Sequence, residues 1–257
     1  MAVTKPELIG SLRGLDLSDG DKVILHSSLS SIGHVDGGAD TVVDAFLDVL
    51  GSGGTLMVPT FTQPTGESPF DQAQTPSKTG AITEAVRRRA DAERSNHPTH
   101  SVTAIGSDAR SVTTGHGPMN SLGEGSPMHR LLRDGGDIVL LGVTHTVNSS
   151  VHIVEKLADV PYRDQTRASL VLEDGEVMTV RTNAVHCSLG FDKLRPLVRV
   201  AKCGREGYVG QARTQVFPGF RFLEIVREAL EDQPGLVLCD DPSCERCEYA
   251  RREIWAE

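Results

Sequence analysis

The chain has 257 residues, of which 38% are hydrophobic and 24% charged, a composition typical of a globular protein with a substantial core. Its 26 basic and 35 acidic side chains give a net charge of −9, which argues against sequence-independent nucleic-acid binding. The same charge suits a cationic ligand, although solubility alone also accounts for it. There is no run of eighteen apolar residues and no signal-peptide core, so we predict no membrane association and a cytoplasmic location.

The first half of the chain alternates predicted helices and strands. After a capping box at residues 4–7, the pattern gives a strand at 22–26, a helix at 40–50 and a strand at 55–59. A strand, a helix and a strand within about forty residues imply a right-handed parallel crossover. The long stretch 62–78 has no periodicity, as expected of a lid or binding loop.

Further elements follow in the same style up to residue 143. They are a helix at 80–92, a strand at 101–105, a helix at 107–113, a helix starting at Ser126-Pro127 and a strand at 138–143.

The second half reads as antiparallel. Asp174-Gly175 lies between the strand patterns 168–173 and 176–182, which is a strong hairpin signal. A strand at 208–216 and an amphipathic helix at 220–230 follow. We therefore predict one α/β domain over residues 1–257, with a mixed sheet that is parallel in its first half and antiparallel in its second.

The most informative stretch runs from Gly142 to Glu155. It begins where an apolar strand pattern ends, and ligands of open α/β sheets bind at such ends. Asn148 is predicted to cap a helix on which His152 and Glu155, three residues apart, share one face. A histidine beside a carboxylate is typical of a general base, although the same spacing also occurs on solvated helix faces.

Several ordered blocks over residues 8–230 together resemble the aminoglycoside 3-N-acetyltransferase family. The blocks are 26–33 with Gly37-Gly38, 54–62, 94–102, Ser126-Pro127 leading into 140–143, 148–155 and, more weakly, 207–210. The resemblance implies a three-layer sandwich of helices around the mixed sheet. It also implies transfer of an acetyl group from acetyl-CoA to the 3-amino group of a 2-deoxystreptamine aminoglycoside.

By this resemblance His152 is the catalytic base and Glu155 orients it. Glu155 could equally pair with Lys156 or Arg163. His145 occupies a family position in the loop before the helix, where contact with substrate and stabilisation of the loop are equally good interpretations.

The same resemblance implies where acetyl-CoA binds. The expected residues are His26, Ser27, Ser28, Leu29, Ser30, Ser31, Gly37 and Gly38, with Ser101 and Val102 in the same groove and Ser126 at the phosphates. Backbone N–H groups and hydroxyls can hold pantetheine amides and a pyrophosphate without basic side chains, and glycines allow close approach. The structural alternative for the serine-rich run is an ordinary helix-capping loop.

A polyamine sugar calls for carboxylates in its cleft, and the loop 62–78 is where we expect specificity. Asp71, Glu67 and Glu124 lie in loops able to form that cleft, although solvated loop acids explain them as well. His97 and His100 flank a proline, which favours a rigid loop over a metal site.

The chain closes with a cysteine-containing tail at 239–257. Cys239, Cys244 and Cys247 have spacing compatible with a small structural zinc site, whose fourth ligand would be Cys187, Cys203 or His186. Independent reduced thiols and a redox role are the alternatives.

The leading prediction is therefore an enzyme with a cationic amine substrate, monomeric or homodimeric, with no nucleic-acid or membrane partner. Two alternatives stay open: an acyl-CoA N-acyltransferase for a different biosynthetic amine, and a binding protein for acyl-CoA or antibiotic without turnover. A metal hydrolase built on His145, His152 and Glu155 is the least favoured alternative.

Overall fold

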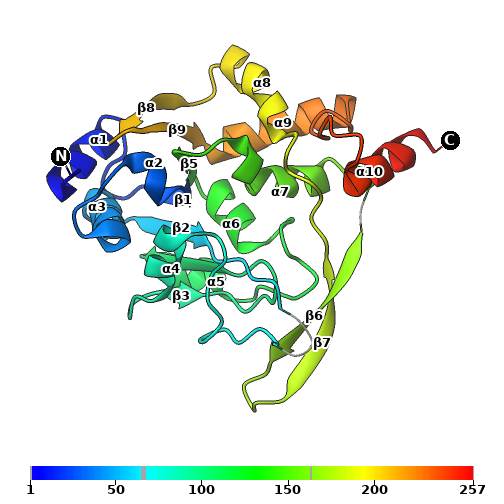
Figure 1. The fold of residues 1–257 in the computed structure, drawn as a ribbon, viewed down its shortest axis with the longest axis horizontal. Helices are drawn as coiled ribbons and strands as arrows, with labels where there is room; N and C mark the ends of the chain where they lie inside the picture. Colours follow the sequence, from blue (N-terminus) through cyan, green and yellow to red (C-terminus); the bar gives the residue numbers. More distant parts are fainter. Residues whose placement is uncertain (1, 65–67, 163, 257) are drawn as a thin grey trace.

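A seven-stranded mixed sheet runs through the centre of the computed structural model, which describes residues 2–64, 68–162 and 164–256 (Figure 1). In spatial order the strands are β3 (Glu93–Arg94), β4 (Val102–Gly106), β2 (Thr55–Pro59), β1 (Lys22–Ser27), β5 (Asp137–Leu141), β9 (Ala212–Pro218) and β8 (Arg205–Val209). β1 pairs in parallel with β2 and β5, and every other pairing in this sheet is antiparallel. The predicted mixed α/β sheet is confirmed.

Alternation of side chains along the central strands creates two separate cores. In β1, Val23 and Leu25 pack on one face, whereas Ile24 packs on the other. Because the strands are apolar on both faces, helices must cover both, which gives three layers.

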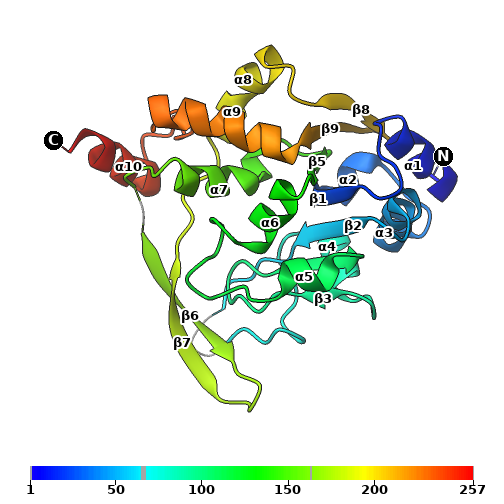
Figure 2. The same cartoon turned by 180° about the vertical axis from the view of Figure 1, so that it is seen from behind.

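The helices divide accordingly (Figures 1 and 2). The first core is covered by α1 (Lys5–Arg13), α3 (Gly38–Leu50) and α4 (Ala81–Arg87). The second is covered by α5 (Ala109–Thr113), α6 (Pro127–Arg133), α7 (Ser150–Leu157) and α9 (Gly219–Asp232). The shorter helices are α2 (Leu29–Ile32), η1 (His145–Val147), η2 (Phe191–Leu194) and α8 (Arg195–Val200), and α10 (Glu245–Trp255) ends the chain.

The loops that follow β1 and β5 meet at Gly142. This glycine has a φ of 66°, and a Cβ built on it would lie 2.4 Å from the Cβ of Ser31. The Ser31 hydroxyl donates to the Gly142 carbonyl at 3.0 Å. Only glycine allows this approach, which fixes the two loops together at the carboxyl end of the parallel strands.

Two predictions about the strands need correction. The parallel pairings are confined to three central strands, because β4, from the first half of the chain, runs antiparallel to β2. The stretch 208–216 is two strands and not one, because Gly210, with a φ of 57°, turns the chain between β8 and β9.

The predicted hairpin around Asp174-Gly175 is confirmed, but it lies outside the central sheet. Its strands, β6 (Gln165–Val171) and β7 (Val177–Asn183), form a separate two-stranded sheet that projects from the body of the molecule (Figure 1).

The helix ends differ from the pattern by a few residues. α4 stops at Arg87, and the cap of α7 is Ser149 instead of Asn148. The Asn148 side chain still serves the helix start, because its Oδ1 accepts the N–H of Ser150 at 3.2 Å. In the described part of the chain, every helix is too short or too polar to cross a lipid bilayer.

Candidate active site

His152 and Glu155 form a buried hydrogen-bonded pair on α7. The helix turn brings the two side chains together, and Nδ1 of His152 donates to Oε2 of Glu155 at 2.6 Å. Their exposed fractions are 7% and 5%, so neither belongs to a solvated helix face. The contact occupies Nδ1 and leaves Nε2 as the nitrogen able to exchange a proton with a ligand.

Neighbouring side chains hold this pair in place. Tyr162 donates its hydroxyl to Oε1 of Glu155 at 3.2 Å and also lies 3.0 Å from the Pro234 carbonyl. Burial, and then the Glu155 charge, raise the pKa of Tyr162 well above its usual value, so its hydroxyl stays a donor. Phe191 packs edge-on against the His152 ring at 4.8 Å between centroids.

Two adjoining cavities lie beside the pair. The smaller, about 90 Å³, is lined by His152, Glu155 and Tyr162. The larger, about 730 Å³, has the size of a small-molecule site. Residues 164 and 183–186 line both cavities, so a ligand in the larger one lies next to the histidine.

The larger cavity is lined by Phe61, residues 62–64 and Lys78, so both ends of the predicted binding loop reach it. Asp71 and Glu124 do not line it. Asp71 uses Oδ1 to accept the N–H groups of Ala73 and Gln74, and Glu124 is exposed elsewhere. Glu67 and Arg163 lie outside the described residues.

The carboxylates that do line this cavity are Asp164 and Glu245, which the sequence analysis missed. Asp164 precedes the hairpin and Glu245 lies inside the cysteine tail. The hairpin was predicted, but nothing local indicates that its base folds back beside α7.

The serine-rich loop after β1 borders an open hollow of about 860 Å³. Its lining includes residues 27–30 together with Gly37 and Gly38, and Ser31 lines the next hollow along with Gly142. Gly37 and Gly38 have φ values of 75° and 65°, a backbone that leads into α3 and favours glycine at both positions.

The remaining candidates for the cofactor site are buried. His26 lies inside β1, Val102 is core in β4, and the Ser101 hydroxyl donates to the Thr60 carbonyl at 2.7 Å. Ser126 caps α6 as predicted, accepting the N–H of His129 at 3.4 Å.

His145 is also fully buried. Its ring stacks on Phe222 and contacts Phe217, and Nδ1 lies 3.3 Å from Nδ2 of Asn148. This placement favours the loop-stabilising interpretation of His145.

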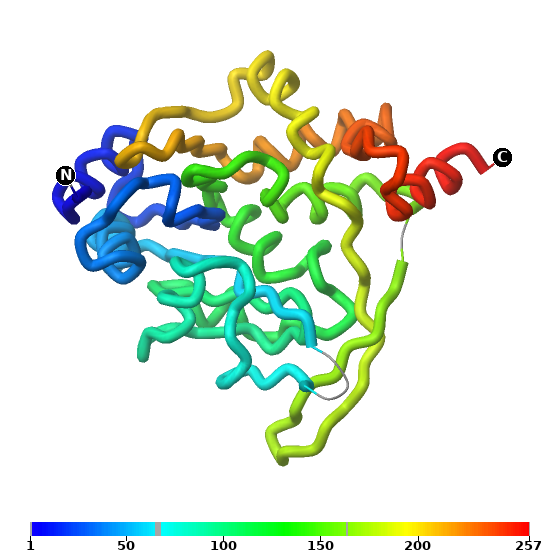
Figure 3. The backbone as a smooth tube through the Cα atoms, viewed as in Figure 1, coloured from blue at the N-terminus to red at the C-terminus, as the bar shows by residue number. Residues whose placement is uncertain are grey.

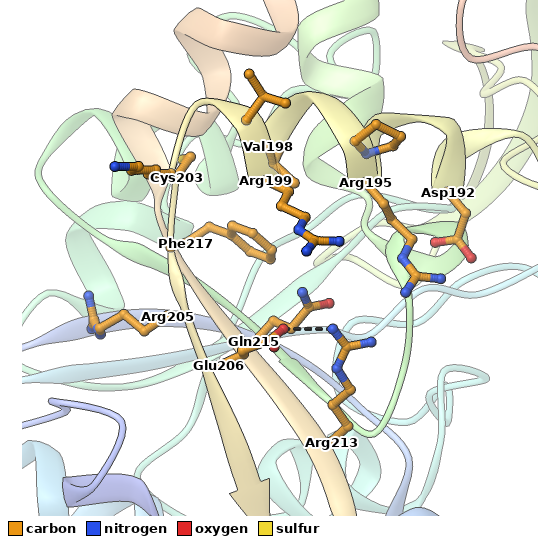
Figure 4. A pocket seen from close by; sticks show the side chains of 14 residues that line it. Asp192, Arg195, Val198, Arg199, Cys203, Arg205, Glu206, Arg213, Gln215 and Phe217 are labelled. Atoms are coloured by element: carbon orange, nitrogen blue, oxygen red, sulfur yellow. Dashed lines mark hydrogen bonds and ion pairs between the residues drawn. The ribbon is translucent and has the colours of Figure 1, made fainter.

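A basic groove of about 1210 Å³ is lined by residues of α8, β8 and β9. Figure 4 shows Arg195, Arg199 and Arg213 reaching into it from α8 and β9. Arg213 is paired with Glu206 at 2.6 Å. Arg195 and Arg213 also line the small hollow at Ser31 and Gly142, so this groove adjoins the loop after β1.

In the tail, the sulfur atoms of Cys239, Cys244 and Cys247 meet that of Cys187, all within 4.8 Å of one another. Cys203 instead belongs to the core beneath α9, and the His186 ring lies between those of Tyr162 and Tyr249. Of the three residues considered as a fourth ligand, the fold brings Cys187 to the cluster.

Several other histidines serve as neutral packing groups. His97, stacked on His116 at 4.5 Å, accepts the N–H groups of Thr99 and His100, as a rigid loop requires. Burial is the main cause that lowers the pKa values of five histidines: to about 3 for His26 and His100, about 2 for His97, and about 4 for His116 and His145.

Comparison with known proteins shows the family to which the chain belongs. The model of the family described as aminoglycoside 3-N-acetyltransferase matches residues 24–231. Aminoglycoside N(3)-acetyltransferase VII of Streptomyces paromomycinus is 33% identical over 250 residues, covering 84% of this chain and 87% of the relative. The chain belongs to the aminoglycoside 3-N-acetyltransferase family of enzymes.

Solved structures share the whole fold. Apo aminoglycoside acetyltransferase AAC(3)-IVa aligns with a TM-score of 0.91 at 28% identity, covering 99% of this chain and 98% of that one. A histidine-to-alanine mutant of the same enzyme, solved in complex with a gentamicin, aligns equally well. AAC-IIIb in its binary complex with CoASH shares the fold with a TM-score of 0.84 at 23% identity, covering 91% and 98% of the two chains.

The buried neutral histidines predict acid lability. An unfolded histidine takes up a proton near pH 6.5, whereas these folded ones do so only at pH 4 or below, so stability is lost as pH falls through that window. Within that pH range, each such histidine lowers the free energy of unfolding by about 1.4 kcal/mol for every pH unit of acidification. Thermal melts should therefore show a clear fall in Tm between pH 7.5 and 5.0, and an unchanged Tm would contradict this account.

Proposed function

We propose that this protein transfers the acetyl group of acetyl-CoA to the 3-amino group of 2-deoxystreptamine aminoglycosides, with His152 as general base. The observation that carries the proposal is the 2.6 Å bond from His152 to Glu155 beside the adjoining cavities. Membership of the family supports the reaction and the class of acceptor.

The pair has the properties that the reaction needs. An ammonium group cannot attack a thioester, so the acceptor reacts as the neutral amine, and its nitrogen must lose a further proton as the new N–C bond forms. Nε2 of His152 takes that proton, while Glu155 stabilises the resulting imidazolium. When the tetrahedral intermediate collapses, the C–S bond breaks and the imidazolium returns the proton to the departing CoA thiolate.

Glu155 and Tyr162 act as positioning residues in this scheme. Glu155 fixes which nitrogen of His152 carries the hydrogen, and Tyr162 fixes Glu155. Phe191 closes one side of the ring and limits access of water.

For the acetyl donor, the proposal places CoA along the loops that follow β1 and β5. The hollows at residues 27–31 and 142–144 run beside these loops, and CoASH in a fold neighbour supports the choice of donor. Arg195 and Arg213 lie where this path meets the basic groove (Figure 4), which suits the phosphates of the cofactor. The cytoplasm, where acetyl-CoA is available, stays the predicted location.

For the acceptor, the larger cavity offers carboxylates near the base. Asp164 lines both cavities and Glu245 lines the larger one, which Lys78, Arg167 and Arg246 also line. The two carboxylates can therefore pair with individual ammonium groups of an amino sugar, although the described residues that line the cavity have no excess of acidic side chains. The gentamicin complex of a related enzyme supports the acceptor class.

The alternatives fit the geometry less well. A binding protein without turnover does not require a buried base held by two partners. A metal hydrolase requires converging ligand atoms, but those of His145 are packed against Phe217 and Asn148. An acyltransferase with another amine acceptor would use the same residues, and an assay with a panel of aminoglycosides distinguishes it.

The base is tested with His152→Ala. Release of thiol from acetyl-CoA should require an aminoglycoside with a free 3-amine and should fall by about 10²-fold or more in the variant. The KM for acetyl-CoA should stay close to wild type, because the ring is needed for proton transfer. Thiol release with no member of the panel, despite saturable acetyl-CoA binding, would point to another amine.

Two matched variants separate charge from packing in the same assay. Glu155→Gln keeps the shape but removes the charge that stabilises the imidazolium, so kcat should fall by about 10-fold or more. Tyr162→Phe removes one hydrogen bond and should have the smaller effect on kcat. Equal kcat values for wild type and Glu155→Gln would show that the Glu155 charge takes no part in catalysis.

Acceptor recognition is tested with Asp164→Asn. Loss of one carboxylate from the cavity should raise the KM for the aminoglycoside by about 10-fold at low salt and less at high salt, because salt screens the attraction. Asp71→Asn, whose carboxylate caps its own loop, is the control for acidic residues outside the cavity. A larger rise in the KM for the aminoglycoside in Asp71→Asn than in Asp164→Asn would contradict the placement of the acceptor beside Asp164.

The phosphate contacts are tested with Arg195→Gln. The KM for acetyl-CoA should rise by about 10-fold while that for the aminoglycoside stays unchanged, since a charged hydrogen bond is lost only to the cofactor. Arg227→Gln, on the exposed side of α9, controls for the change in net charge. An unchanged KM for acetyl-CoA would exclude the groove from cofactor binding.

A further inference from the structure

Four cysteines from three separate segments meet beside the cavities. Cys187 follows β7, Cys239 follows α9, and Cys244 and Cys247 begin α10. All four sulfur atoms lie within 4.8 Å of one another. Thiolates at about 2.3 Å from a tetrahedral zinc ion are about 3.8 Å apart, so small side-chain adjustments close the site on one ion.

The surroundings suit thiolate ligands. Backbone N–H groups of Leu189 and Cys239 donate to the sulfur atoms of Cys187 and Cys247 at 3.5 and 3.4 Å, which is how outer partners orient metal-bound cysteines. Arg251 donates to the Cys239 carbonyl, and Lys193 donates to the Leu238 carbonyl at 2.7 Å. The Arg251 guanidinium therefore lies close to a site that would carry a net charge of about −2 with zinc bound, while Lys193 is paired with Asp240 at 2.5 Å.

Few buried apolar side chains of the described residues hold the tail against the rest of the molecule. α10 has eleven residues, and the buried ones are Cys247 and Ala250. They belong to a small core with Val160, Tyr162 and Leu238. So little apolar surface holds a charged helix weakly, whereas a metal joining three segments would contribute folding free energy directly.

We propose that Cys187, Cys239, Cys244 and Cys247 bind one structural zinc ion. The closeness of the four sulfur atoms favours a single ion over a larger iron–sulfur cluster, whose several metal atoms would hold the thiolates further apart.

The zinc site also shapes the wall of the larger cavity, a step that rests on the proposed function. Cys187 follows His186, which lines both cavities, and α10 supplies Glu245, Arg246 and Tyr249 to the larger one. Figure 3 shows the red C-terminal segment beside the chain that leaves the hairpin. The metal thus joins the two segments that form this wall.

The first test measures metal directly and needs no activity. Protein purified without chelators should contain about one zinc per chain, and cobalt substitution should give the absorption of tetrahedral thiolate ligation. Cys247→Ala should lose the zinc and lower the Tm. Cys187→Ser should also lose zinc, and because it keeps three of the four ligands it serves as the second variant if Cys247→Ala fails to fold. Cys203→Ser, at a cysteine outside the cluster, should keep the metal.

The outcomes separate clearly. Absence of zinc from the wild type, disulfides among the four cysteines, bound iron in its place, or full zinc in both cluster variants would each overturn the site. If Cys187→Ser raises the KM for the aminoglycoside by about 10-fold and leaves that for acetyl-CoA unchanged, the link to the cavity wall is supported. Equal KM values in a variant that has lost zinc would refute that link while leaving the metal site standing.

Discussion

The parallel pairing of β1 with its neighbours β2 and β5 is the constraint on which the rest of this structure depends. Parallel strands end at the same edge of a sheet, so the loops after these three strands are brought together there. Gly142 lets the β1 and β5 loops touch, and α7 starts directly beyond them. Both the hollows along these loops and the position of His152 follow from that one arrangement.

Burial then determines what each histidine can do. Burial lowers the pKa values of His26, His97 and His100 until they stay neutral. His152 differs because a carboxylate lies against Nδ1 and a cavity lies beside it. His145, shortly before α7, is instead enclosed by Phe217 and Phe222. The two histidines therefore differ in their surroundings and not in residue type.

The two proposed ligand sites differ in the charged side chains that line them. Arginines from α8 and β9 line the groove near the β5 loop, whereas the cavity beside His152 has both carboxylates, from the hairpin base and α10, and the basic side chains Lys78, Arg167 and Arg246. In the proposed reaction the first meets the phosphates of the donor and the second the ammonium groups of the acceptor. The reactive pair lies beside the second of these regions.

Sequence by itself determined whatever depends on neighbours along the chain. The spacing of His152 and Glu155, the hairpin at Asp174-Gly175 and the proline-started helix at Ser126 are set by local geometry, and each was predicted from a few residues. The pattern of elements predicted the mixed sheet, and the family blocks added the three-layer arrangement and the class of enzyme.

Only the tertiary structure decided which distant residues share a site. Asp164 reaches the cavity because the hairpin folds back beside α7, and Cys187 rather than Cys203 joins the cysteine cluster because of where β7 ends. Asp71 was a reasonable choice by residue type, but its carboxylate is engaged by its own loop. Such pairings depend on contacts between segments far apart in the chain, and local periodicity carries no information about them.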